Sequence, residues 1–153
     1  MFDFEKDGSI EWLGTTYRTL LSPEASGGAM SIIDSIGPAR SGPPRHIHRD
    51  ADETFVVLTG TIGFWLDGAT QVCGAGSSVF VPRGVPHTFL VLGDEPSRHL
   101  IILSPGGFEG FFTEMATGRF AIPGDMAQIE EAAGRFDLDF VGPPLDGSEF
   151  TSE

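Results

Sequence analysis

Four side chains of the kind that bind transition metals lie in two short segments of this chain. His46 and His48 are separated by one residue, Glu53 follows five positions after His48, and His87 lies further along. Side chains alternate between the two faces of a β-strand, so the ring nitrogens of His46 and His48 can converge on one ion. Glu53 would then arrive from a neighbouring strand and His87 from a third. The sequence therefore predicts a mononuclear metal centre inside a β structure.

This ligand set indicates what the centre can do. Three neutral imidazoles and one carboxylate suit one divalent transition metal, which can be Fe, Mn, Ni, Cu, Co or Zn. In octahedral geometry these ligands leave two positions open, where an enolate or catecholate oxygen and dioxygen can bind. Glu53 has a second role as a candidate catalytic residue, because a carboxylate that loosens from the metal can take the proton of a substrate hydroxyl. The alternative is a structural site, for instance closed zinc.

The elements that must position these residues are predicted to be short strands. Glycine and proline recur every several residues, and the segments between them are rich in Val, Ile, Phe and Thr. This pattern is typical of an all-β sandwich or barrel. Turn signals at Gly60 and Gly68 favour antiparallel neighbours. Strands are expected near residues 10–13, 16–21, 29–36, 45–48, 53–59, 61–66, 70–73, 78–82, 88–92 and 98–104.

Helical spacing replaces the strand pattern towards the C-terminus. Apolar residues from Phe108 to Met115 predict a helix that Gly118 ends. A second helix is expected to start near Pro123 and to close at Gly134. We expect the first helix to lie against the barrel, and whether it forms a lid over the barrel mouth or a brace for a dimer stays open.

Length and composition restrict the class of protein. The 153 residues fit one domain, with a barrel over about 9–104, a helical and extended segment over 105–145, and a flexible tail over 146–153. The single Cys73 cannot form an internal disulfide, and the N-terminus carries acids without a long apolar run. We therefore expect a cytoplasmic protein with no signal peptide or membrane span. The formal net charge of −13 argues against nucleic acids and anionic membranes as partners.

His87 ends a second pattern of its own. Gly76 is followed after five residues by Pro82, then by Gly84 and, three positions later, by His87. Glycine and proline at this spacing suit a strand–turn–strand corner, with His87 beginning the returning strand. The pattern is weak alone, but it is specific in combination with the first segment.

Together the two segments resemble the two motifs of the cupin superfamily, whose members are small jelly-roll β-barrels. Two positions depart from these motifs. Arg40 stands where the first motif opens with glycine, with Gly42 two residues later, and Val91 stands where the second motif usually has asparagine. The resemblance runs from about Ile10 to Leu145, through stretches such as WLGTTYRTLLSPEASGG and LSPGGFEGFF. It is greatest for single-domain bacterial cupins of the quercetin dioxygenase-like type.

The resemblance implies a jelly-roll β-barrel with short C-terminal helices, a homodimer, and a metal held by the four residues above. Cupins include dioxygenases, isomerases, epimerases, decarboxylases and proteins without catalysis, so the fold does not settle the reaction. Our leading expectation is an oxygen-dependent dioxygenase that acts on a phenolic or enediol-type small molecule bound to the metal. The alternatives are a non-catalytic binding or sensing protein, and a non-redox metal-dependent isomerase or hydrolase.

Residues that share strand parity with the ligands should line the substrate pocket. They are mostly apolar, which favours an aromatic or otherwise hydrophobic substrate over a sugar phosphate. The predicted lining is Phe55, Val57, Phe64 (or Trp65 in its place), Phe89 and Val91. The remaining histidine, His99, lies in an expected strand, and we expect it at the surface or behind the ligands rather than in the pocket.

Overall fold

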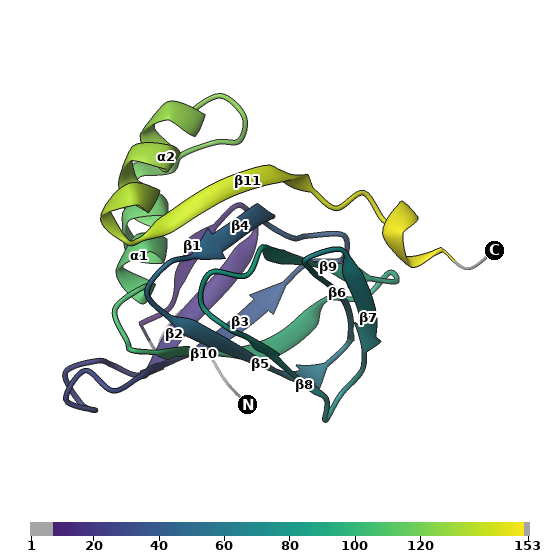
Figure 1. Ribbon diagram of the computed structural model, residues 1–153, viewed down its shortest axis with the longest axis horizontal. Helices are drawn as coiled ribbons and strands as arrows, with labels where there is room; N and C mark the ends of the chain where they lie inside the picture. Colours follow the sequence, from purple (N-terminus) through teal and green to yellow (C-terminus); the bar gives the residue numbers. More distant parts are fainter. Residues whose placement is uncertain (1–7, 152–153) are drawn as a thin grey trace.

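Eight consecutive strands of the computed structural model, which describes residues 8–151, are divided between two facing antiparallel sheets (Figure 1). The first sheet has the order β3-β10-β5-β8 and the second the order β4-β9-β6-β7. Their bounds in chain order are β3 Ser31–Gly37, β4 Pro44–His48, β5 Asp52–Thr59, β6 Thr61–Leu66, β7 Ala69–Cys73, β8 Ser78–Val81, β9 His87–Leu92 and β10 Ser97–Ser104. This is the strand order of a double-sheet jelly roll. The predicted fold class is confirmed.

The core follows from alternation along these strands. On β5, Glu53, Phe55 and Val57 are buried between the sheets, and the residues between them are only half-buried. On β10 the same alternation buries every second residue from Ser97 to Leu103. Because both sheets turn one face inward, most of the buried apolar area lies in the space between them.

Three further strands extend the two sheets. β1 (Ile10–Trp12) and β2 (Thr15–Leu21) continue the first sheet beyond β3, and β11 (Leu138–Pro144) pairs with β4 at the edge of the second. In Figure 1 β11 runs from the helices across the barrel beside β4. We expected an extended segment in this C-terminal part of the chain. It is hydrogen-bonded into the sheet as a strand, in register with both histidines of β4.

Two helices lie together at one side of the barrel (Figure 1): α1 (Glu109–Gly118) and α2 (Met126–Arg135). α1 ends at Gly118 as predicted, and the next residue adopts the left-handed conformation that stops a helix. α2 begins three residues after Pro123 and runs through the expected stop at Gly134. The residues before α2 instead form a turn, in which the Asp125 carboxylate accepts a hydrogen bond from the backbone N–H of Ala121 at 2.8 Å.

The C-terminal tail differs from the flexible segment that we expected. Ser148–Phe150 form a short 3-10 helix, η1. The Phe150 ring lies over Gly63, where an added Cβ would come within 2.6 Å of it. Because Gly63 on β6 has no side chain, the Phe150 ring can pack directly against the strand.

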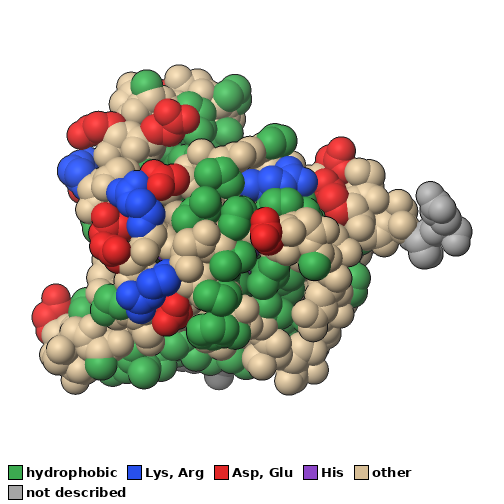
Figure 2. Space-filling model, viewed as in Figure 1, with side chains coloured by type: hydrophobic (Ala, Val, Ile, Leu, Met, Phe, Trp, Pro, Cys, Tyr) green, Lys and Arg blue, Asp and Glu red, His purple; other side chains and the backbone are tan. Residues whose placement is uncertain are grey.

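Charged side chains of opposite sign lie next to each other on the surface. On the face shown in Figure 2, Arg side chains neighbour Asp and Glu rather than gathering in a basic patch. Arg49, for example, bonds to Asp137, and Arg135 bonds to Glu114. In the described part of the chain, no helix is long and apolar enough to cross a membrane.

Candidate metal centre

The four predicted ligands come together between the two sheets, and all four are buried. His46 and His48 lie on β4, and His87 is the first residue of the adjacent β9, directly opposite His46 in register. Glu53 was expected from a neighbouring strand. It comes from β5 in the facing sheet, so the cluster joins the two layers of the barrel.

The ligand atoms of this cluster all lie within 4.8 Å of one another. Each oxygen of Glu53 contacts one imidazole: Oε2 lies 3.0 Å from His48 Nε2, and Oε1 lies 3.2 Å from His87 Nε2. The Nδ1 atoms of His46 and His87 lie 2.8 and 2.9 Å from the carbonyl oxygens of Pro44 and Val85. An Nδ1–H that donates to a carbonyl leaves the lone pair on Nε2, the nitrogen that a metal needs.

Electrostatics at the cluster favour an ionised carboxylate among close imidazoles. Burial alone would raise the pKa of Glu53, but His48 and His87 hold that pKa well below its usual value. Burial, together with the neighbouring His87 and His48, lowers the pKa of His46 to about 3. For His87, burial acts to lower the pKa, but the hydrogen bond and charge of Glu53 raise it above its ordinary value.

These observations fit a divalent transition metal. The donor set consists of three imidazoles and one carboxylate, the ligand types that such metals take. Two of the imidazoles are oriented by backbone carbonyls in the manner of metal-binding histidines. Without a cation, the cluster would bury a carboxylate that only imidazoles neutralise, which costs free energy.

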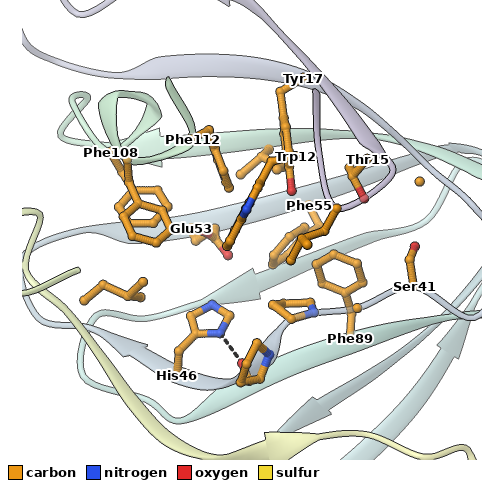
Figure 3. A pocket seen from close by; sticks show the side chains of 18 of the residues that line it. Trp12, Thr15, Tyr17, Ser41, His46, Glu53, Phe55, Phe89, Phe108 and Phe112 are labelled. Carbon is orange, nitrogen blue, oxygen red and sulfur yellow. Dashed lines mark hydrogen bonds between the residues drawn. The ribbon is translucent and has the colours of Figure 1, made fainter. Parts of the chain in front are cut away.

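A cavity of about 130 Å³ opens from this cluster into the barrel. Figure 3 shows His46 and Glu53 at one end and Thr15 and Ser41 at the other, with aromatic rings between them. The aromatic side chains that line it are Trp12, Tyr17, Phe55, Phe89, Phe108, Phe111, Phe112 and Phe140. The walls are therefore mostly apolar, as predicted.

Two of the predicted pocket residues line this cavity, Phe55 and Phe89. Val57, Phe64 and Val91 do not line it, although all three are fully buried. They share the inward face, as their parity required, but they lie further along their strands in the packed core. Strand parity gives the face of a residue and not its depth in the barrel, and this is why these three lie on the inward face without lining the cavity.

The helices and the N-terminal strands supply the lining that the sequence did not predict. Phe108 precedes α1, and its ring lies 4.5 Å from that of His48. Tyr17 on β2 stacks on Phe112 of α1 with ring centroids 4.1 Å apart. α1 therefore forms part of the cavity wall, and the apolar spacing that predicted the helix was the available signal. Nothing in the sequence placed Trp12 beside it.

His99 lies on the inside of the barrel, which corrects our expectation for it. It is 1% exposed and lines the cavity beside Phe55 and Phe89. Neither of its ring nitrogens has a hydrogen-bond partner among the described residues. Burial lowers its pKa to about 4.

Comparison with known proteins agrees with this geometry. A family model for the cupin domain matches residues 33–103. The chain is 27% identical over 121 residues to quercetin 2,3-dioxygenase of Bacillus subtilis (strain 168), covering 79% of this chain and 35% of that protein, so it spans about a third of the relative's length. It is 30% identical over 127 residues to polyketide synthase CurC of Streptomyces cyaneus, covering 80% of this chain and 82% of that protein. The solved structure of KdgF from Halomonas sp. superimposes with a TM-score of 0.62 at 14% identity, over 72% of this chain and 96% of that one.

Proposed function

This chain belongs to the cupin superfamily, and we propose that within it the protein is a metal-dependent enzyme that oxidises a phenolic or enediol-type small molecule with dioxygen. One observation carries the proposal: a buried His/His/Glu/His cluster lies at one end of a cavity lined by aromatic side chains. The similarity to quercetin 2,3-dioxygenase supports it.

His46, His48, Glu53 and His87 would hold the metal, as the sequence predicts. A redox-active divalent metal at this site supplies Lewis acidity towards a substrate oxygen and electron transfer to dioxygen. In a dioxygenase reaction both oxygen atoms enter the product, so no separate reductant is required.

Glu53 is the base in this proposal. It is the one carboxylate among the described residues that line the cavity, and its low pKa keeps it ionised. It takes the proton of the substrate hydroxyl and returns it to the product. The aromatic walls orient the substrate ring and keep water away from the reacting atoms.

The size of the cavity limits the substrate. Its volume of about 130 Å³ is close to that of an engineered cavity of about 150 Å³ that holds benzene. The enclosed space is therefore of the size of one aromatic ring, and a flavonol would extend far beyond it. We propose a monocyclic phenol or enediol as the substrate class.

The test combines metal analysis with oxygen uptake. Protein purified without chelator is analysed for metals, loaded with iron or manganese, and offered catechols, diketones and flavonols while dissolved oxygen is recorded. We expect near-stoichiometric metal and oxygen consumption with monocyclic catechols, and neither in the His48→Ala variant. No oxygen uptake by the loaded protein with any of these compounds would contradict the proposal.

A second candidate function is supported by a different observation. The similarity to polyketide synthase CurC extends over 82% of that protein, against 35% of the quercetin dioxygenase. A cyclase acting on a polyketide would use the same cluster without redox chemistry, with Glu53 removing a proton next to a carbonyl. Turnover of a polyketide-type diketone under nitrogen in the zinc-loaded protein would favour this candidate over the oxidase.

We also propose that the protein is a cytoplasmic homodimer. The dimer follows from the family resemblance, and the location is supported by the lone Cys73, which has no partner for a disulfide. Analytical ultracentrifugation over the micromolar concentration range tests the dimer. A monomer at every concentration in that range would contradict it.

A further inference from the structure

Away from the metal-binding cluster, the cavity wall and the core next to it contain buried polar groups without partners among the described residues, of which His99 lines the cavity. They lie on the inward faces of β3 and β10, where alternation would otherwise place apolar core. The side chains of Ser35, Ser97 and His99 are each 1% exposed, and their polar atoms have no hydrogen-bond partner among the described residues. Burying a polar group in this way costs free energy, so the arrangement needs a reason.

These groups form a row across neighbouring strands. Ser35 on β3 is paired in register with His99 on one side and with Tyr17 on the other. Side chains directly opposite each other in an antiparallel pair have Cβ atoms about 5 Å apart. Tyr17 and His99 also line the cavity, and Figure 3 shows Tyr17 reaching into it on the side of Thr15. His99 and Tyr17 therefore face the cavity from one wall, and Ser35 is the buried residue between them in register.

His99 is the member best placed to contact a ligand. Its ring lies edge-on to Phe89, with centroids 5.2 Å apart, and 5.8 Å from Phe55. These two phenylalanines fix the plane of the imidazole without bonding to either nitrogen. With a pKa of about 4, His99 is neutral at physiological pH. A neutral imidazole offers one donor and one acceptor, which matches a hydroxyl group or, through the donor alone, a carbonyl.

His99 lies further along the barrel than the metal-binding cluster, because it is paired with Val57 on β5, four residues beyond Glu53. Phe55 stands between these two residues of β5, and its ring lies 6.4 Å from the ring of His87 and 5.8 Å from that of His99. A substituted aromatic ring lying along Phe55 would place one end at the cluster and the other at His99. Such a molecule also matches the cavity volume of about 130 Å³.

We propose that His99 binds an uncharged hydroxyl or carbonyl group on the end of the substrate that points away from the metal-binding residues. This inference rests on the proposed function for the orientation of the substrate. It adds that the substrate is a ring with oxygens at both ends, and that His99 selects it. An alkyl group in place of the distal oxygen leaves His99 without a partner and binds more weakly.

The test uses matched probes that differ only at the distal end. Zinc-loaded protein, which does not oxidise catechols, is titrated by calorimetry with 4-methylcatechol and 3,4-dihydroxybenzyl alcohol. The same pair without the second ring hydroxyl, p-cresol and 4-hydroxybenzyl alcohol, is titrated in parallel. In the wild type we expect each hydroxymethyl compound to bind about five-fold more tightly than its methyl counterpart.

His99→Leu, of similar volume, should reverse this preference so that the methyl compounds bind more tightly. His99→Gln, which keeps a donor and an acceptor, should keep at least a two-fold preference for the hydroxymethyl compounds. Circular dichroism and Tm measurements test whether both variants fold. If His99→Leu does not fold, the preference measured for His99→Gln tests the inference instead.

Three results would overturn the inference: equal preference in wild type and His99→Leu, preference for the methyl compounds in the wild type, or no binding of any probe at millimolar concentration. The first of these indicates that ordered water alone occupies this end. Failure of the proposed function has a different signature. In that case catechols bind no better than monophenols, while the monophenol pair still measures the contribution of His99.

Discussion

The two ends of the cavity hold the same kind of side chain in opposite situations. At one end each oxygen of Glu53 contacts an imidazole, and backbone carbonyls orient His46 and His87. At the other end His99 is equally buried, and neither nitrogen has a partner among the described residues. The first end is oriented before anything binds, which suits an ion with fixed geometry. At the second end the ring nitrogens of His99 remain available to form hydrogen bonds with a ligand.

The largest expected effect on metal binding is at the first end. His48→Ala removes a ligand and leaves Glu53 with a single imidazole contact, so metal occupancy should fall at least ten-fold while the barrel stays folded. His99→Leu is the matched control, because it removes an imidazole from the other end and should retain the metal. Elemental analysis and circular dichroism measure both. Full occupancy in His48→Ala would show that the ligand assignment is wrong.

Replacing the carboxylate separates catalysis from binding at the same end. Glu53→Gln keeps an oxygen that can bind the metal but removes the base, so turnover should fall by about 100-fold or more. Metal occupancy should fall less than in His48→Ala. Steady-state oxygen uptake, corrected for metal content, checks this. Asp52→Asn is the control, since that carboxylate belongs to the preceding residue and bonds outward to Arg83; equal losses in both variants would count against the role of Glu53.

At the second end the expected effect depends on pH. The folded-state pKa of His99 is about 4, below its ordinary value of 6.5, so the unfolded chain binds more protons between these two values. Stability from this group is complete above about pH 6.5 and is lost as the pH falls towards 4. Between pH 7 and pH 5 the free energy of unfolding of the wild type should therefore fall by about 2 kcal/mol more than that of His99→Leu. Urea denaturation of both proteins at the two pH values measures this, and parallel pH profiles would contradict it.

The smallest expected effect is the change in the free energy of unfolding that His99→Leu causes at neutral pH without ligand. His99→Leu removes unpartnered polar atoms from the barrel interior, so it should raise the free energy of unfolding by about 1 kcal/mol. A buried histidine with a structural role would give the opposite sign. Thermal unfolding of the metal-loaded proteins distinguishes the two, and a lower Tm in the variant would indicate that His99 supports the fold.

The predictable features were those set by local spacing. All ten expected strands are present, with ends displaced by no more than two residues, because short-range alternation and turn residues specify strands. The HxH spacing likewise placed His46 and His48 on one face. Where the first cupin motif has glycine, Arg40 takes the left-handed backbone that favours glycine, with φ of 69°. Its N–H donates to the carbonyl of Val91 at 3.0 Å, which helps to hold that conformation.

The remaining features depend on contacts between distant parts of the chain. The run around His99 has apolar residues on both faces, so its sequence does not show which face turns inward. The sheet that carries Glu53 is decided by pairing between β5 and β10, which local spacing does not encode. The place of Gly42 also emerged only in three dimensions: a Cβ there would collide with the Phe89 carbonyl oxygen.

The pairing of β11 with β4 determines where the C-terminal boundary of a truncated version of this domain should lie. The match to the family model ends at residue 103, before β11 begins. A chain truncated there would leave the strand that carries two metal-binding histidines as an open edge, with backbone groups free to pair with another molecule. Such a fragment should aggregate, and it should do so through β4. β11 thus covers the edge of β4, the strand that carries His46 and His48, and prevents β4 from pairing with another molecule.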